Sequence, residues 1–317
     1  MQPALSYSLV VPVYRNEDNI PSLLAAIAGL SDALGPSFEA IFVVDGSPDA
    51  SHARLAEALP SQPFTSVLVA LARNFGAFAA IRHGLGLARG RQIAVMAADL
   101  QEPPQLVVQL LERVRAGVDI AFGTREGRDD PALSKVLSGL YWALYRRWVI
   151  PDVPKGGVDI FALSHVVRDA LMRMPEANTS LLAQLFWLGG RRAFVPYARQ
   201  RREIGHSAWT LRKKLRYLMD SVFSFTDLPI RLLLGLGGAG LLVSVVLAAL
   251  VIAAKLSGEV PVPGYAATIL VVLFFGAFNA LGLGIIGSYV WRAYENTKAR
   301  PLTIEQQADR FPPDNRP

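Results

Sequence analysis

The chain has 317 residues and a formal net charge of +6; 52% of its residues are hydrophobic and 18% are charged. This length holds one good-sized domain with further elements attached. The sequence contains no cysteine, which excludes a disulfide framework and cysteine metal sites and agrees with a cytoplasmic domain. Residues 1–14 lead into an apolar strand, without the basic and apolar regions of a secretory signal.

Short apolar runs alternate with amphipathic segments through the first part of the chain. Strands are predicted at residues 7–14, 39–45, 65–72, 91–98 and 118–124. Helices are predicted at residues 19–34, 50–59, 78–90 and 103–117. This alternation favours an α/β fold with a mostly parallel sheet covered on both faces. A further helix with aromatic and basic faces is predicted at residues 133–148.

Polar side chains follow each predicted strand. The clusters are Tyr14 to Asn16, Asp45 to Ser47, Arg73 with Asn74, Asp99 to Gln101, and Thr124 with Arg125. Any one of them has a structural explanation, because a strand must end in a turn. Five clusters that mix carboxylates with arginines instead indicate one polar crevice, since ligands of doubly wound sheets bind beyond the carboxyl ends of the strands. The sequence has neither a GxGxxG dinucleotide fingerprint nor a P-loop.

Two long uncharged runs follow, at residues 232–254 and 265–291. About 20 apolar residues span a bilayer, so both runs predict transmembrane helices, with two buried core helices as the alternative. Residues 191–216 and 291–301 are rich in Lys and Arg, whereas the connector at 255–264 is nearly neutral. The positive-inside rule then predicts an inner (plasma) membrane protein whose catalytic domain and both termini are cytoplasmic.

The basic stretch before the first span favours membrane lipids over nucleic acid as a partner, because it lies beside the membrane. Within it, residues 211–225 form a basic amphipathic pattern that predicts a helix lying in the interface. Packing of this helix on the catalytic domain is the alternative. The four histidines lack metal-ligand spacing, so no role is predicted for them.

An ordered set of motifs carries a family resemblance. It consists of "VVPVYRNE", "VVDGSPD", "LARNFG", "ADLQEPP", "GTRE", "GGVDIFALS", "RREIGHSAW", the two spans and "GSYVWRAYENTKARP". The set resembles the family 2 glycosyltransferases that act on polyprenyl phosphates, which include dolichol-phosphate mannose synthase, undecaprenyl-phosphate glucosyltransferases and the aminoarabinose transferase of lipid A modification. The resemblance covers nearly the whole chain. It implies a Rossmann-like GT-A domain at 1–208, a juxtamembrane helix at 209–230, a transmembrane hairpin at 231–292 and a cytoplasmic tail at 293–317.

The resemblance also implies roles on the donor side. Asp45 matches the second acid of a "DDGS" turn, which contacts the nucleotide base, while the first acid is Val44 here. Asp99 and Gln101 match the metal-binding part of "DADLQxPP", in which the first acid has become Ala97. Other strand-end residues are expected to bind the nucleotide sugar, and these are Pro12, Tyr14, Arg73 and Asn74.

The chemistry of the reaction supports a metal at the "DLQ" turn. Breaking a sugar–phosphate bond leaves a nucleotide diphosphate whose growing charge needs a cation. Mg²⁺ and Mn²⁺ prefer oxygen ligands. Mg²⁺ usually keeps several bound waters, so that few protein groups are needed besides the substrate phosphates. Asp99 and the amide oxygen of Gln101 supply such ligands. The alternative is that Asp99 only caps the helix that follows Pro103 and Pro104.

On the acceptor side, Arg125 in the "GxR" position and Arg202 in the "RxxGxS" position match groups that hold the acceptor phosphate. Lys135 and Ser207 are added to this set, since cations and hydroxyls suit phosphate oxygens. Asp159, in "GGVDIF", matches an acid placed close to the sugar and acceptor. The residues expected to be catalytic are therefore Asp99, Arg125, Asp159 and Arg202.

The resulting prediction is an inverting transfer of a hexose from a nucleotide sugar to undecaprenyl (polyprenyl) phosphate, with UDP-glucose as the first choice of donor. GDP-mannose, an N-acetylhexosamine donor and an aminopentose donor remain open. A processive polysaccharide synthase would need more spans. An inactive sugar-nucleotide-binding scaffold is the alternative from another class. The expected partners also include a second copy of the chain, as a homo-oligomer, and a lipid-sugar flippase.

Overall fold

The computed structural model describes residues 5–125, 143, 145–147, 150–154, 158–198, 219–257 and 264–313. It divides into two compact units, which are Met1–Lys214 with Arg300–Pro317, and Leu215–Ala299. The predicted division left 293–317 as a separate tail. In the structure, the residues after 299 belong instead to the first unit, together with the predicted catalytic domain.

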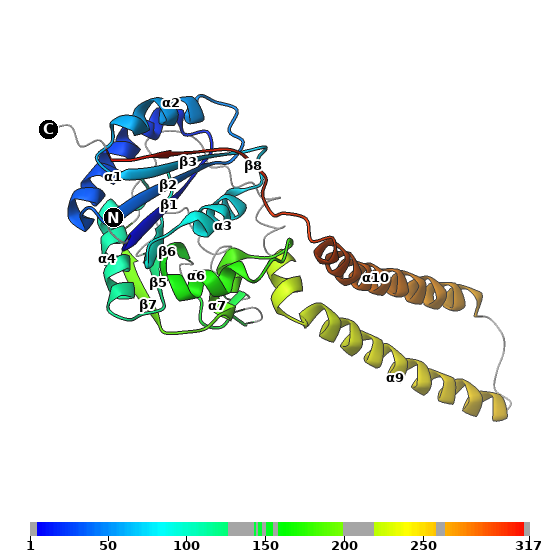
Figure 1. The fold of residues 1–317 in the computed structure, drawn as a ribbon. Helices are drawn as coiled ribbons and strands as arrows, with labels where there is room; N and C mark the ends of the chain where they lie inside the picture. The colour runs from blue at the N-terminus through cyan, green and yellow to red at the C-terminus, as the bar shows by residue number, and fades with distance from the viewer. Residues whose placement is uncertain are drawn as a thin grey trace. The chain divides into compact units, whose positions relative to one another are not determined.

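The first unit is built on one sheet. Among the described residues the sheet has eight strands in the order β7-β5-β6-β4-β1-β2-β3-β8 (Figure 1). The strands are β1 (Tyr7–Val13), β2 (Phe38–Val44), β3 (Thr65–Leu71), β4 (Gln92–Val95), β5 (Ile120–Arg125), β6 (Val158–Ser164), β7 (Arg192–Tyr197) and β8 (Glu305–Phe311). Four neighbours, β4, β1, β2 and β3, run parallel, and β5 is parallel to β7. β6 and β8 are antiparallel to their neighbours. The predicted α/β class with a mostly parallel sheet is confirmed.

Helices cover both faces of this sheet. They are α1 (Ile20–Leu34), α2 (Ser51–Ala58), α3 (Ala77–Leu87), α4 (Pro104–Arg115), α6 (His165–Met172) and α7 (Leu181–Trp187), with 3₁₀ turns η1 (Glu17–Asn19) and η2 (Leu59–Ser61). In Figure 1, α1 and α4 lie on one face and α3, α6 and α7 on the other. Every residue of β2 is buried, as expected for a strand inside a parallel sheet covered on both sides.

The sequence predicted five of the eight strands, each within a few residues of its observed bounds. β6 was quoted as a motif but not predicted as a strand. β7 contains Pro196 and follows Arg191, so its sequence was assigned to the basic stretch before the membrane. β8 is polar, and five of its seven residues are exposed, so no apolar pattern marks it.

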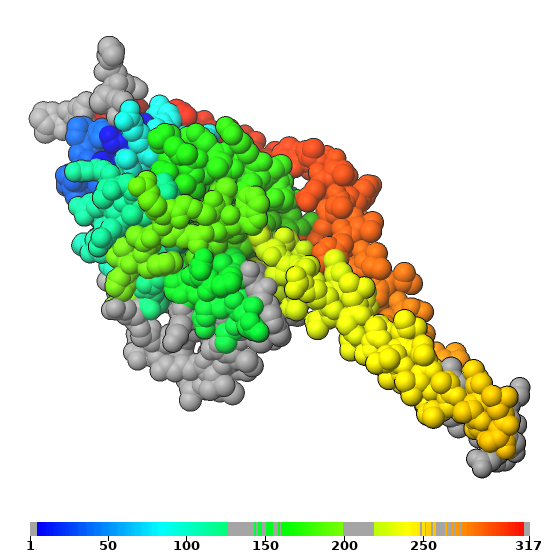
Figure 2. All heavy atoms as spheres, turned by 90° about the horizontal axis from the view of Figure 1, so that it is seen from below, coloured from blue at the N-terminus to red at the C-terminus, as the bar shows by residue number. Residues whose placement is uncertain are grey.

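The second unit consists mainly of α9 (Leu228–Leu256) and α10 (Tyr265–Thr297). Both are long and apolar enough to cross a membrane by length and composition, and they contain the two predicted spans. Many of their large apolar side chains are exposed, for example Leu234 at 69% and Leu283 at 70%. On the face seen in Figure 2, side chains of α9 (yellow) and α10 (orange) stand side by side. Apolar surface of this kind suits a lipid environment.

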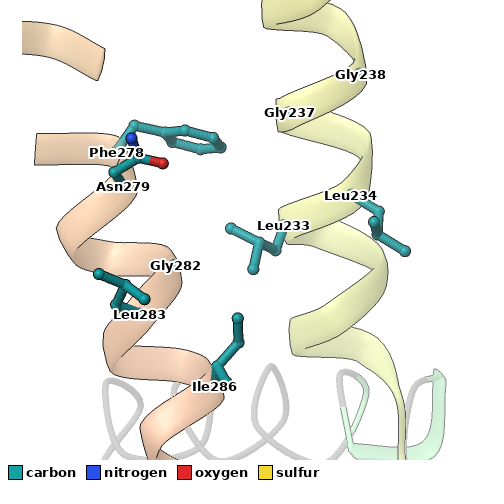
Figure 3. Close-up of a pocket in the computed structure, with 9 residues that line it drawn as sticks. All are labelled: Leu233, Leu234, Gly237, Gly238, Phe278, Asn279, Gly282, Leu283 and Ile286. Atoms are coloured by element: carbon teal, nitrogen blue, oxygen red, sulfur yellow. The ribbon is translucent and has the colours of Figure 1, made fainter. Parts of the chain in front are cut away.

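Large side chains of each helix lie over glycines of the other. The pairs, measured from a Cβ atom placed on the glycine, are Gly240 with Phe275 at 3.5 Å, Gly237 with Phe278 at 3.9 Å and Gly282 with Leu233 at 3.3 Å. All three share one antiparallel register, because each step along α9 matches an equal step back along α10. Figure 3 shows Leu233 and Phe278 pointing into the space between the helices. Residues of both helices line a cavity of about 310 Å³ there. Large side chains of one helix thus reach the small residues of the other across the space between the helices.

The same register continues into the helical residues 219–225 before α9. The Tyr289 hydroxyl donates to the carbonyl oxygen of Thr226 at 3.4 Å, and Arg292 Nη2 donates to Asp220 Oδ1 at 2.7 Å. The Arg292 guanidinium also lies 5.2 Å from the ring centre of Phe223. The described end of the predicted amphipathic helix therefore packs on α10, a contact that neither sequence alternative included. Residues 211–218 lie outside the described part of the chain.

Candidate active site

The predicted site residues come from one edge of the sheet. β1 to β4 are parallel, and β5 has the same direction because β6 is antiparallel to both β4 and β5. Their carboxyl ends therefore meet at one edge, where α/β proteins bind ligands. The residues placed there by these strand ends are Tyr14, Asp45, Arg73, Asn74, Asp99, Gln101 and Arg125. Pro12 lies in β1 beyond the last residue that pairs with β4. Proline has no backbone N–H to donate, but at this position no hydrogen bond between β1 and β4 is lost.

Antiparallel β6 begins at this edge. Its first residue, Val158, pairs with Thr124 near the end of β5, next to an irregularity in the register. The backbone of Asp159 therefore lies at the same edge, although more than thirty residues of sequence separate it from Arg125. The sequence carried no geometric signal for this placement, which follows from β6 inserting between β4 and β5.

Asp45 is buried, with 2% of its surface exposed. Its Oδ1 accepts a hydrogen bond from the backbone N–H of Phe75 at 2.7 Å, and its Oδ2 accepts one from Gly76 at 2.8 Å. Burial raises the pKa of this carboxyl, against the opposing effects of the two N–H groups and the charge of Arg73. In this structure Asp45 holds the loop that follows β3, and its predicted contact with a nucleotide base stays a prediction.

The turn at Gly46 fits closely against that loop. Gly46 has a φ of 54°, and a Cβ atom there would lie 2.3 Å from the carbonyl carbon of Arg73 and 2.5 Å from the backbone nitrogen of Asn74. The Asn74 side-chain amide donates to the carbonyl oxygen of Asp45 at 3.3 Å. The loops after β2 and β3 are thus locked together through backbone contacts.

A second network joins the loops after β1 and β2. Asp49 Oδ1 accepts from the Ser47 hydroxyl at 2.6 Å, and Oδ2 accepts from the Ser51 hydroxyl at 2.9 Å and from the backbone N–H of Glu17 at 3.2 Å. Burial raises the pKa of Asp49, but these hydrogen bonds outweigh it and lower the pKa. The Ser47 hydroxyl in turn accepts from the backbone N–H of Arg15 at 2.8 Å. Sequence reasoning missed Asp49, although its place two residues after "DGS" is typical of a turn-forming acid.

The "DLQ" turn follows β4 with an unusual backbone. Leu100 has a φ of 51°, in the left-handed region that disfavours a branched side chain. Strained positions of this kind cluster at functional sites. The Gln101 N–H lies 3.5 Å from Asp99 Oδ1. α4 begins after Pro103, which occupies its N-cap position and makes no side-chain capping hydrogen bond. The alternative that Asp99 only caps this helix stays open.

Two arginine–aromatic pairs flank the edge. The Arg73 guanidinium lies 4.1 Å from the ring centre of Phe75, and the Arg15 guanidinium lies 5.5 Å from that of Tyr14. Both arginines are exposed. Flat π surfaces next to guanidinium groups suit a planar base and an anionic phosphate. Phe75 was not predicted, because no sequence pattern pairs it with Arg73.

The predicted acceptor-side residues are described only in part. Arg125 ends β5 and is half-buried. Lys135, Arg202 and Ser207 lie outside the described residues, and only the backbone of Asp159 is described. Within the described part of the chain, no cluster of three or more His, Asp or Glu side chains can hold a metal ion. Of the residues predicted to bind the metal, Asp99 and Gln101 are both described at this edge.

Comparisons with known proteins agree with this architecture. Residues 8–174 match the family model "Glycosyl transferase family 2". An uncharacterised glycosyltransferase of Synechocystis sp. is 32% identical over 95% of this chain and 94% of that protein. A protein of Escherichia coli K12 named "Prophage bactoprenol glucosyl transferase homolog" is 29% identical over 95% of this chain and 98% of that protein.

Among solved structures, the glucosyl-3-phosphoglycerate synthase of Mycobacterium tuberculosis with Mn²⁺ and UDP-glucose has a TM-score of 0.47 at 19% identity, over 67% of this chain and 75% of that chain. The sheet, its polar edge and the family match define the class as a GT-A glycosyltransferase. The chain belongs to glycosyltransferase family 2, which confirms the resemblance found in the sequence.

Proposed function

We propose that the protein is a membrane-anchored, inverting glycosyltransferase that moves a hexose from a nucleotide diphosphate sugar to undecaprenyl (polyprenyl) phosphate. The observation that carries the proposal is the joining of a family 2 catalytic sheet to two apolar helices in one chain. Relatives of matching length named bactoprenol glucosyl transferase support a lipid acceptor and glucose as the sugar. UDP-glucose is the donor that we propose. GDP-mannose, N-acetylhexosamine and aminopentose donors are the alternatives that the assay distinguishes.

The reaction is a single displacement. An oxygen of the acceptor phosphate forms a bond to the anomeric carbon, and the bond from that carbon to the donor diphosphate breaks, so that its electron pair leaves with the nucleotide diphosphate. A lipid monophosphate is mostly ionised at neutral pH, since its second pKa is about 6. No strong base is therefore needed. The product is a β-linked lipid phosphosugar for cell-envelope glycan modification.

Charge on the leaving diphosphate is the main electrostatic demand. Asp99 and Gln101 fit a divalent ion such as Mg²⁺ or Mn²⁺, because a carboxylate and an amide oxygen are hard ligands. When bound, this ion offsets the charge that develops on the leaving diphosphate. The left-handed turn at Leu100 fixes the backbone between the two ligands. Tyr14, Arg73 and Asn74 are proposed to bind the nucleotide sugar. Asp45 holds the loop after β3, which carries Arg73 and Asn74.

Two negatively charged phosphates must approach each other in this reaction. Arg125, at the end of β5, is proposed to hold the acceptor phosphate with Lys135, Arg202 and Ser207, and Asp159 to lie near the sugar. Guanidinium groups suit this task because their fork matches phosphate oxygens. Assembly into a homo-oligomer and cooperation with a lipid-sugar flippase belong to the same proposal.

Pairing of β8 with β3 supports one common side of the membrane for the catalytic domain and the segment after α10. β8 follows α10 and lies in the same sheet as residues 7–71. The catalytic domain and the segment after α10 are therefore on one side of the membrane, which agrees with two crossings by α9 and α10. We propose that this side is the cytoplasmic one, because the basic residues beside both spans favour it and the sugar-nucleotide donor is found there.

The direct test is transfer of radiolabelled sugar to polyprenyl phosphate by the purified full-length protein, with a panel of sugar nucleotides and with Mg²⁺ or Mn²⁺. We expect lipid-linked product from UDP-glucose and almost none from Asp99→Asn, which loses the carboxylate ligand. Asp32→Asn, on the exposed side of α1, is the matched control and should retain activity. An inactive wild type that still binds UDP-glucose would favour the scaffold. Metal-independent turnover would contradict the metal site.

A further inference from the structure

The last strand of the sheet lies next to the loop that Asp45 holds. β8 pairs with β3 from Ser66 and Phe311 to Leu71 and Glu305, and Figure 1 shows it (red) along the outer side of β3. We call residues 301–311 the strap. Within the described residues it forms the edge of the sheet beyond β3. The chain thus returns from α10 to the donor side of the catalytic unit.

The strap reaches the start of the loop directly. The backbone N–H of Ala72 donates to the carbonyl oxygen of Ile304 at 2.9 Å. Ala72 is the residue between β3 and Arg73. The next residues, up to Gly76, carry the two N–H groups that bind Asp45. A shift of the strap at Ile304 would therefore move the loop at its first residue.

The strap also contacts the helix that follows the loop. His83 Nδ1 lies 2.9 Å from the hydroxyl oxygen of Thr303, and His83 Nε2 lies 3.2 Å from Glu305 Oε2. His83 belongs to α3, which begins at Ala77 directly after Gly76. The strap consequently holds the loop from both sides, through Ala72 before it and through α3 after it.

Little apolar burial holds the strap. Five of the seven β8 residues are exposed, and Phe311 packs only partly against the core. Its attachment depends on the β3 ladder and on the His83 contacts. Segments with few buried apolar contacts and exposed hydrogen bonds open at lower free energy than the core. Loss of the His83 contacts would therefore loosen the strap while the rest of the sheet stays folded.

We propose that the strap positions the Arg73–Gly76 loop for the nucleotide sugar, with His83 and Thr303 as its positioning residues. The proposal rests on the proposed function of this edge as the donor site. With the strap paired, the loop has the conformation that engages Asp45 and presents Arg73. With the strap loosened, donor binding weakens while the chemical step on bound donor is retained.

The kinetic test compares His83→Ala and Thr303→Val in the full-length protein. Thr303→Val should raise the KM for the sugar nucleotide about fivefold, the factor that corresponds to one ordinary neutral hydrogen bond. His83→Ala loses both contacts with the strap and should raise this KM at least as much. The kcat and the KM for polyprenyl phosphate should change less than about twofold, because the strap is proposed to affect donor binding and not the chemical step or the acceptor. His83→Gln keeps a side-chain hydrogen-bond donor and acceptor, so its KM for the sugar nucleotide should lie between those of the wild type and His83→Ala. His165→Ala, an exposed histidine on α6, is the control.

Hydrogen exchange separates positioning from general instability. His83→Ala should speed exchange at residues 72–76 and 304–311 and leave α4 and β1 unchanged. By linkage, UDP added alone to the wild type should slow exchange in both segments. Unchanged donor KM in both variants, a fall in kcat alone, or UDP protection of the loop without the strap would each overturn the proposal. Absence of transfer to lipid, with UDP still protecting both segments, would overturn the proposed reaction instead.

Discussion

Gly46→Ala tests whether the loops after β2 and β3 are locked as the structure indicates. Gly46 has a φ of 54°, and its missing side chain leaves room for the Arg73 and Asn74 backbone. A methyl group there would lie 2.3 Å from the Arg73 carbonyl carbon, closer than any Cβ contact tolerates. Because the obstructing atoms are backbone, no side-chain rotation relieves the clash. The loop after β3 must move away from Asp45.

The cost has two parts. An alanine in the left-handed region is less favourable than glycine by about 1–2 kcal/mol. Loss of one of the two hydrogen bonds from the loop to the Asp45 carboxylate adds about 1.5–3 kcal/mol. Together they lower the free energy of unfolding by roughly 3–5 kcal/mol, and the unfolding temperature by about 10 °C for a domain of this size. UDP-glucose affinity should fall as well, since Arg73 and Asn74 move.

The measurements are thermal unfolding of the detergent-solubilised protein and a UDP binding isotherm. Gly29→Ala is the matched control, because Gly29 lies inside α1 with no atom within 4 Å of an added Cβ. That variant should be neutral or more stable by about 0.5–1 kcal/mol, as alanine is the better helix former. A Gly46→Ala protein that unfolds and binds UDP like Gly29→Ala would refute the locked arrangement.

Three further predictions concern the acceptor, the loop network and the membrane. Arg125→Lys keeps the charge but loses the guanidinium fork, so activity should fall chiefly at low lipid concentration, and a normal lipid titration would remove Arg125 from the acceptor site. Asp49→Asn should destabilise the protein at neutral pH; because the folded pKa of Asp49 is lowered from 3.8, the difference from wild type should persist above this pH and shrink as the pH falls below it, and a constant difference in acid unfolding curves would contradict the network. A reporter that fluoresces only in the cytoplasm should be bright at either terminus and dark when inserted near residue 258, and a bright insertion would reverse the orientation.

The sequence predicted the polar edge of the sheet more completely than the contacts within it. Apolar strands alternating with helices predicted β1 to β5, and the polar residues after them followed from the direction of parallel strands. The partners of Asp45 were out of reach of this reasoning, because the N–H groups of Phe75 and Gly76 come from a loop thirty residues away. β8 was missed for a related reason. Its polar residues gain stability from the β3 ladder, a tertiary partner that the local pattern of Glu305–Phe311 does not reveal.

The two donor-side departures from the family pattern, Val44 and Ala97, have unequal consequences. Val44 is the last residue of β2, pairs with Val13 and Ala70, and lies in the hydrophobic core with 2% of its surface exposed. An apolar residue packs well at this position. The adjacent Asp45 still makes the hydrogen bonds that hold the loop after β3. Ala97 is different, since it is half-buried in the turn that leads to Asp99. In the proposed metal site, the acid missing at this position leaves one carboxylate and one amide oxygen as protein ligands. We expect the donor diphosphate and water to complete the ion's shell, so metal affinity should depend strongly on bound donor.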